Sequence, residues 1–266
     1  MTLRRFQLIE RFFQINSASY DKNQSLEKVL PLLKMFEGFN DVYQPTSRIC
    51  IDEIVAPFVG RFSYIVYNPM KPDKWGIKIF GVADAITGYC LNLIPYMGAE
   101  TYKFFKVGSL NGLVADSMKK YGCEGASLYI DNYYCNFTLA EILLSLGFNV
   151  TGTFRQNRKD VPKIYKEAVV KKKVIAKQAV QPTNKKKANE IKETKDTRYF
   201  SSELGIYAIK WRSKREVSML TTNHPLGFEE RESARNRPSD RPAVIHEYNQ
   251  YMRGIDRLNQ RTHYIK

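Results

Sequence analysis

The sequence is poor in the residues that build disulfide frameworks and zinc sites. Among its 266 residues there are four cysteines, no two of them in a C-x-x-C pair, and only three histidines. A disulfide framework needs paired cysteines, and a structural zinc site needs cysteine or histidine ligands at short, regular spacings. The composition therefore argues against both a disulfide scaffold and a zinc finger.

Long apolar runs are also missing. No apolar stretch reaches the roughly 18 residues that a membrane-spanning helix requires, and the opening MTLRRFQLIERFFQI mixes charged and bulky residues, unlike a signal peptide. We therefore expect a soluble, intracellular chain without a membrane segment. Since 43% of the residues are apolar, the chain can bury a full core, either as one large domain or as a domain with an insertion.

Positive charge is abundant, and most of its excess lies in one segment. The chain carries a net charge of +15, yet residues 48–154 hold nine basic and nine acidic side chains. Residues 155–198 hold fifteen basic and five acidic side chains, a local excess of +10, with little apolar periodicity. This segment is either a solvated linker, or a phosphate-binding arm or nuclear-import signal. Composition alone leaves these alternatives open.

The neutral block between residues 48 and 154 has a regular order of secondary structure. The alternation of apolar and polar residues predicts five strands: RICIDEIVAPF, KWGIKIFGVAD, YCLNLIPY, ASLYID and FNVTGTF. The second and third are separated by turn residues and should form a hairpin. LNGLVADSMKKYG has helical spacing and ends on Gly122, and a second helix, LAEILLSL, should open on a capping box at Thr138–Glu141 and close at Gly147. Strands that alternate with short helices predict a mixed α/β sheet covered on both faces.

Two aspartates mark the first and fourth of these strands. Asp52 interrupts the first apolar run, and Asp131 directly follows the fourth, in SLYIDNYYCN. Asp131 could simply start a turn, because aspartate often leaves strands by bonding to its own backbone. If the two strands are neighbours, however, both carboxylates converge at one edge of the sheet, and a divalent cation is the usual way to keep both ionised. Asp256, in HEYNQYMRGIDRLNQ, is the candidate for a third carboxylate.

Taken together, these motifs resemble those of the piggyBac family of transposases over essentially the whole chain. The similar stretches are RRFQLIERFFQIN, the block from ICIDEIVAPF to PYMG, YIDNYYCNFTLAEILLSLGFNVTGTFRQNRKDVPK, and EYNQYMRGIDRLNQ. The resemblance implies an RNase H-like mixed five-stranded sheet with flanking helices, interrupted by a basic insertion domain. The expected organisation is the end of an N-terminal helical region (1–47), the catalytic core (48–154), the insertion domain (155–243) and the last catalytic helix (244–266).

The same resemblance implies a metal-dependent chemistry. Asp52, Asp131 and Asp256 would be both the catalytic residues and the ligands of a two-metal site that holds Mg²⁺ or Mn²⁺. Family members cleave DNA at transposon ends, form hairpin intermediates and insert at TTAA sites. The expected partner is therefore double-stranded DNA, the expected location is the nucleus, and a homodimer is the assembly to be considered.

The chain departs from the family pattern near the third aspartate. Arg253 stands where the family usually has a glycine, and Asn259 stands where a further acid is expected. The family's cysteine-rich C-terminal domain and most of its N-terminal DNA-binding region have no counterpart in the sequence. These departures predict a partial or domesticated copy with impaired catalysis. The alternative is a nuclear DNA-binding protein without catalytic activity.

Basic residues near the expected site are candidates for contacts with nucleic acid. They lie around Trp75, after the fifth strand and in the lysine-rich segment: Lys71, Lys74, Lys78, Arg155, Arg158, Lys171, Lys172 and Lys173. Glu53 follows Asp52 and should point to the opposite face of the strand, so we expect it in a structural salt bridge and not at the metal.

Overall fold

The computed structural model of the chain describes residues 1–12, 30–39, 41–69, 74–167, 197–212, 215–223, 228–232 and 238–263. Its helices are α1 (Leu3–Phe12), α2 (Leu30–Phe39), α3 (Ala99–Phe104), α4 (Leu110–Tyr121), α5 (Phe137–Ser145), α6 (Lys163–Glu167), α7 (Ala243–Tyr251) and α8 (Gly254–His263). The first six strands are β1 (Arg48–Pro57), β2 (Ile65–Tyr67), β3 (Trp75–Asp84), β4 (Cys90–Pro95), β5 (Ser127–Ile130) and β6 (Asn149–Thr153). The later strands are β7 (Thr197–Ser201), β8 (Tyr207–Arg212), β9 (Glu216–Thr221), β10 (Phe228–Glu232) and β11 (Pro238–Pro242).

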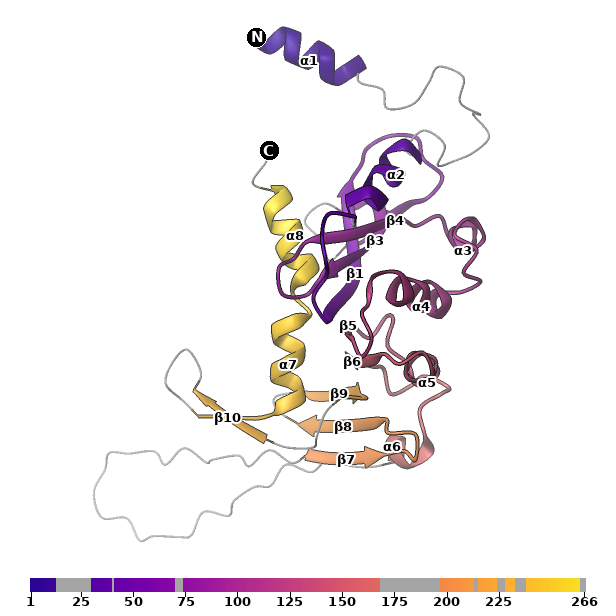
Figure 1. The fold of residues 1–266 in the computed structure, drawn as a ribbon, viewed down its shortest axis with the longest axis vertical. Coiled ribbons are helices and arrows are strands. Elements are labelled where there is room, and N and C mark those ends of the chain that lie inside the picture. Colours follow the sequence, from indigo (N-terminus) through magenta and orange to yellow (C-terminus); the bar gives the residue numbers. More distant parts are fainter. Residues whose placement is uncertain are drawn as a thin grey trace, which may run out of the picture.

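A nine-stranded mixed sheet organises the molecule (Figure 1), in the order β2-β3-β1-β5-β6-β9-β8-β7, with β4 also paired to β3. The five predicted strands form its centre, in the order β4-β3-β1-β5-β6, and β3 and β4 pair antiparallel as the predicted hairpin. The mixed α/β class is confirmed. The predicted number of five strands is wrong for the whole sheet, because the pairing of β9 with β6 adds three strands and β2, paired with β3, is the ninth.

This extension joins residues from the expected insertion to the sheet of the expected core. Strands β7, β8 and β9 lie within residues 155–243, and β10 and β11 pair with each other as a separate two-stranded sheet. The predicted domain boundaries remain predictions. Within the described residues, none of the helices is long and apolar enough to cross a membrane.

Helices cover the two faces of the central strands unequally. On one face, Ile49, Ile51 and Leu128 pack with apolar residues of α4 and α5 into the main core. On the other face, Cys50 and Tyr129 pack against Ile255 of α8 in a smaller cluster. Because neighbouring residues of a strand point to opposite faces, β1 and β5 contribute side chains alternately to both clusters. Figure 1 shows α7 and α8 on the side of the sheet opposite to α4 and α5.

Capping residues fix where α4 and α5 begin and end. The Ser109 side chain caps α4, and the helix ends at Gly122, as predicted. Helix α5 begins two residues earlier than the predicted capping box, because the Asn136 side chain accepts the hydrogen bond from Leu139 N at 2.8 Å. Thr138 therefore lies inside the helix, and the predicted box at Thr138–Glu141 is wrong. Asparagine is as good an N-cap as threonine, so the two starts compete on sequence alone.

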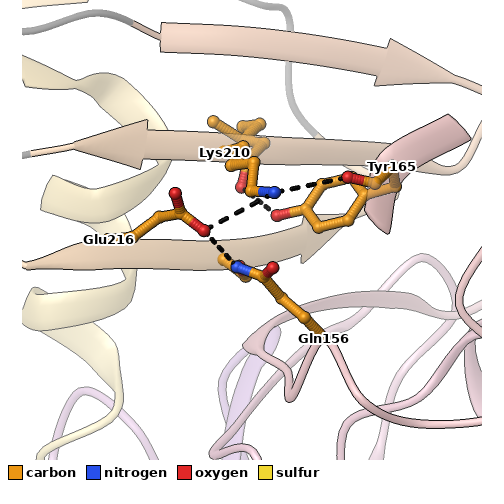
Figure 2. Close-up of polar contacts among 6 residues, drawn as sticks. Gln156, Tyr165, Lys210 and Glu216 are labelled. Atoms are coloured by element: carbon orange, nitrogen blue, oxygen red, sulfur yellow. Dashed lines mark hydrogen bonds and ion pairs between the residues drawn. The ribbon is translucent and has the colours of Figure 1, made fainter. Parts of the chain in front are cut away.

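A buried lysine joins the added strands to the loop and helix that follow β6 (Figure 2). Lys210 of β8 is 3% exposed, and its Nζ lies 3.5 Å from Glu216 Oε1 and 3.3 Å from the carbonyl oxygen of Tyr165. The Gln156 side chain donates hydrogen bonds to Glu216 and to Ser218. A buried ammonium needs such partners, since an uncompensated charge in the interior is costly. The network therefore fixes α6 against β8 and β9.

Asp84, at the end of β3, is a fully buried carboxylate with a structural role. Its oxygens accept hydrogen bonds from Thr46 N at 2.7 Å, from Ile86 N and Thr87 N at 2.9 Å, and from the Tyr43 hydroxyl at 3.1 Å. Burial alone would raise the pKa of this carboxyl, but the hydrogen bonds that it accepts lower the pKa below its usual value. Asp84 thus ties the turn after β3 to the segment that leads into β1.

We predict that Asp84→Asn destabilises the protein at pH 7 by about 2 kcal/mol, because an amide cannot accept all four hydrogen bonds. Since the folded-state pKa is lowered, the stability contributed by Asp84 is present above the unfolded pKa near 4 and is lost as the pH falls through the folded value. The difference in the free energy of unfolding between wild type and variant, measured with urea, should therefore become smaller below about pH 4. Asp116→Asn, at an exposed position on α4, is the matched control. A gap of the same size at pH 7 and at pH 3 would contradict this role.

Candidate active site

Asp52 and Asp131 lie on adjacent parallel strands. Strand β1 pairs with β5 in a register that places Ile51 opposite Ile130, so the next residues along the two strands are the two aspartates. Both share the face of Cys50 and Tyr129, on which α7 and α8 pack, because side chains two residues apart in a strand point the same way. The condition for the two carboxylates to converge, that the first and fourth strands are neighbours, is therefore met.

The chain turns immediately after Asp131, and this aspartate organises the turn. Its Oδ1 accepts a hydrogen bond from Tyr133 N at 2.8 Å, and its carbonyl oxygen accepts from Tyr134 N at 3.2 Å and Cys135 N at 3.0 Å. Tyr134 is fully buried and packs edge-on against Phe80 at 5.9 Å between ring centroids. Asp131 therefore does start a turn. One carboxylate oxygen takes part in that turn, so the structural and the metal-binding roles are compatible.

The start of α8 brings Asp256 to the same face of the sheet. Helix α8 packs on β1 and β3, and Ile255 is buried in the cluster around Cys50. A Cβ atom at Gly254 would lie 2.3 Å from Cys50 Sγ and 3.1 Å from the carbonyl oxygen of Asp84. Only glycine allows this approach. Asp256 follows in the first turn of α8, exposed to solvent, where the helix dipole favours a carboxylate.

The three carboxylates share one electrostatic field. The pKa of Asp52 is raised to about 7, first by burial and then by the negative charges of Asp131, Glu53 and Asp256, against a hydrogen bond from Glu53 N that lowers it. In the metal-free chain, Asp52 therefore holds its proton more tightly than an ordinary aspartate does. A cation placed among these groups would displace that proton.

The donor chemistry of the three aspartates suits a divalent cation, since carboxylate oxygens are what Mg²⁺ and Mn²⁺ prefer. Their spacing is not that of a closed site: among the described residues, no group of three or more histidine, cysteine, aspartate or glutamate side chains is placed to hold a metal ion. The carboxylates are thus electrostatically coupled, with the third one on a helix that approaches the other two.

Helix α7 adds a residue that the sequence analysis missed. Tyr248 bonds to the side chain of Thr153, and its pKa is raised by burial and by the charges of Asp131 and Asp52. One residue before it, Glu247 accepts a hydrogen bond from the Tyr129 hydroxyl at 2.6 Å. The motif HEYNQYMRGID contains both residues, but only the packing of α7 on β1 and β6 brings Tyr248 near the aspartates and Glu247 to Tyr129.

The departures from the family pattern lie in and after the turn between α7 and α8. Arg253 is exposed in that turn, so its charge meets solvent, whereas the glycine required by packing is the next residue, Gly254. Asn259 is half-buried, one turn of α8 beyond Asp256.

The predicted contacts with nucleic acid lie in different surroundings. Lys78 is 15% exposed, pairs with Glu53 at 3.9 Å and lies 4.0 Å from the centre of the Tyr133 ring. The structural salt bridge predicted for Glu53 is therefore confirmed, and it compensates the charge of Lys78. Lys74 is exposed beside Trp75, which is 56% exposed. Lys71, Lys171, Lys172 and Lys173 lie outside the described residues.

Arg155 and Arg158 follow β6 and contact the turn after Asp131. Arg155 Nε donates to Asn132 Oδ1 at 2.8 Å. Arg158 Nη2 donates to two carbonyl oxygens, those of Asn132 and Tyr133, both at 2.8 Å. The structure thus brings both arginines to the turn that follows the second aspartate.

Residues 1–266 match the family model described as Transposase IS4, so the chain belongs to this family of transposases. It is similar to human PiggyBac transposable element-derived protein 3, with 23% identity over 256 residues that cover 92% of this chain and 40% of the relative. The human Chimeric ERCC6-PGBD3 protein is also 23% identical over 256 residues, or 22% of its length. The motif-based resemblance to piggyBac transposases is confirmed.

The fold is similar to that of a solved piggyBac transposase in a synaptic complex with hairpin DNA. The TM-score is 0.71 at 22% identity, and the match covers 98% of this chain and 50% of that one. The chain therefore spans at most half the length of these relatives.

We predict that Gly254→Ala destabilises the protein by about 2 kcal/mol, because the added methyl group overlaps Cys50 Sγ and pushes α8 away from the sheet. Cys50→Ala removes that sulfur and should recover part of the loss in the double variant. Chemical unfolding of both single variants and of the double variant gives the coupling energy. Strictly additive effects would show that Gly254 and Cys50 do not contact each other.

Proposed function

We propose that the chain is a metal-dependent domain for DNA strand cleavage and transfer, with Asp52, Asp131 and Asp256 as its Mg²⁺ or Mn²⁺ ligands. The observation that supports this most directly is the placement of the three aspartates, two of them on the neighbouring strands β1 and β5 and the third in the first turn of α8, which packs on β1. The central strand order β4-β3-β1-β5-β6, with β1 and β5 parallel, is the arrangement expected of an RNase H-like core. DNA as the partner is supported by the solved relative, which was captured with hairpin DNA.

Divalent ions at such a site activate a water molecule or a 3′-hydroxyl for in-line attack on a phosphodiester and stabilise the leaving oxygen. In this chain, Asp52, Asp131 and Asp256 would bind these ions, and each is held in a different way. Asp52 carries a proton that ion binding would release, so binding should strengthen as the pH rises through about 7. Asp131 is fixed by its turn, whereas Asp256 is carried by a helix whose position depends on one glycine contact.

A second candidate function is DNA binding without catalysis, as in a domesticated transposase. It is favoured by one observation: among the described residues, no three potential ligands are placed to hold a metal ion. The two candidates make opposite predictions for metal-dependent cleavage and the same prediction for DNA binding. Nuclear location and a homodimeric assembly are part of the proposal under either function. Imaging of a tagged full chain in cells and sedimentation velocity would test them.

The expected outcome is Mn²⁺-dependent nicking of a duplex that carries TTAA-flanked terminal inverted repeats. The full chain is incubated with this duplex at pH 8, where Asp52 is largely ionised in the metal-free protein. Nicking should fall at least about 100-fold in Asp131→Asn, since a carboxylate ligand is replaced by a neutral amide.

The control is Asp116→Asn, which removes the same charge at an exposed position remote from the aspartates in sequence. DNA binding should be retained in all three proteins. Binding without nicking by the wild-type chain would reject the catalytic function and favour the non-catalytic one. Equal nicking by wild type and Asp131→Asn would reveal a contaminating nuclease.

A further inference from the structure

The Nη2 nitrogen of Arg158 has its hydrogen-bonding capacity committed inside the protein. One nitrogen, Nη2, donates to the carbonyl oxygens of Asn132 and Tyr133, both at 2.8 Å. A second nitrogen, Nε, is buried and makes no hydrogen bond within the described residues. A guanidinium binds a phosphate bidentately through the N–H groups of two neighbouring nitrogens, either Nε and Nη2 or Nη1 and Nη2. Both pairs include Nη2. Arg158 therefore lacks a free edge for a bidentate phosphate contact.

The two carbonyl groups that Arg158 holds belong to the turn that orients Asp131. In that turn, Tyr133 N donates to Asp131 Oδ1 at 2.8 Å, so the amide that fixes the carboxylate lies beside the carbonyls fixed by Arg158. Arg158 comes from the loop after β6, and β6 is paired with β5, which ends at Ile130, directly before Asp131. The guanidinium thus joins the ends of two neighbouring strands across the turn.

Arg155 makes a useful contrast. It also carries one positive charge, but its bond is to the side chain of Asn132 at 2.8 Å, and its own side chain is exposed. Removing Arg155 would leave both backbone carbonyls of the turn in place. The two arginines therefore have the same charge, but only Arg158 donates hydrogen bonds to the backbone of the turn.

We propose that Arg158 is a positioning residue, which holds the 132–133 backbone so that Asp131 presents its carboxylate to a divalent cation. This role rests on the proposed metal-dependent function, although the fixation of the turn can be measured without metal. Groups that orient metal ligands typically change metal affinity 10- to 100-fold when they are removed. DNA affinity should change only by the loss of one charge.

The test compares Arg158→Met, Arg158→Lys and Arg155→Met in the full chain. Methionine keeps an apolar stem and removes the donors, and lysine can restore a donor to the carbonyls. Three quantities are measured: amide hydrogen exchange at Tyr133 without metal or DNA, Mn²⁺ binding to the protein alone by electron paramagnetic resonance, and metal-free affinity for duplex DNA as a function of salt.

In Arg158→Met, we expect the Tyr133 amide hydrogen to exchange about tenfold faster than in wild type. We also expect half-saturation of this variant to require about tenfold more Mn²⁺. Arg158→Lys should recover part of both losses, and Arg155→Met should show neither. Arg158→Met should lose no more DNA affinity and no more salt dependence than Arg155→Met, since each variant loses one charge and Arg155 is the exposed residue of the two.

A greater loss of DNA affinity in Arg158→Met than in Arg155→Met, with unchanged exchange at Tyr133, would overturn the proposal and make Arg158 a phosphate contact. Faster exchange without any change in Mn²⁺ binding would overturn it too, because Arg158 would then serve the fold alone. Failure of the proposed function looks different: wild type would neither bind Mn²⁺ nor nick DNA. In that event the proposed role of Arg158 in presenting Asp131 to a cation is rejected together with the metal-dependent function. The exchange rate at Tyr133 then shows only whether Arg158 fixes the turn.

Discussion

The candidate site depends on the close packing of α8 against the middle of the sheet. Gly254 lies against Cys50 with no room for a side chain, and Ile255 fills the adjoining cluster. Without this contact, Asp256 would be a solvated carboxylate on a polar helix, far from Asp52 in the sequence and unrelated to it in space. With it, Asp256 adds its negative charge to the effects that raise the pKa of Asp52, which are burial first and then the charges of Asp131 and Glu53. Gly254 itself is explained by space, whereas the neighbouring Arg253 is tolerated because it faces solvent.

Two further sets of contacts hold the strand ends around this packing. Asp84 ties the turn after β3 to the segment before β1, so its burial and hydrogen bonds are structural. Arg158 ties the turn after β5 to the loop after β6. The molecule thus has two aspartates that leave strands into turns, Asp84 and Asp131, with opposite surroundings. Four donors satisfy Asp84, whereas Asp131 accepts a hydrogen bond from Tyr133 N and lies near enough to Asp52 to raise the pKa of that residue. Neighbouring carboxylates of this kind are what marks a candidate site for a cation.

Local patterns were sufficient to predict the centre of the fold. Strand alternation and helical spacing located β1, β3, β4, β5 and β6 and the helices between them, because each element has a clear period and a turn at its ends. That order placed Asp52 and Asp131 on two of these strands, but their adjacency was a condition and not a prediction, because the order of strands along the chain does not fix which strands pair. The start of α5 was misplaced because Asn136 and Thr138 are both good caps, and the choice depends on contacts such as the bond from Phe137 N to Asp160.

The remaining features depend on contacts between distant segments. The pairing of β6 with β9 joins residues some 70 positions apart, and nothing in a single sequence fixes that register. The same holds for Tyr248, which becomes part of the site only when α7 packs on the sheet, and for Arg158, whose basic side chain suggested DNA but bonds to backbone carbonyls. In each case the residue type was visible, but its partner was not.

The central claim is that Asp52, Asp131 and Asp256 act as one charge cluster. The most direct measurement is a carbon-13 carboxyl NMR titration of Asp52 in the metal-free full chain, repeated in Asp131→Asn and in Asp256→Asn. The account predicts a midpoint near 7 for Asp52 in the wild type, and a lower midpoint in each variant, because either substitution removes a neighbouring negative charge. A midpoint near 4 that neither substitution moves would show that the three carboxylates do not share a site.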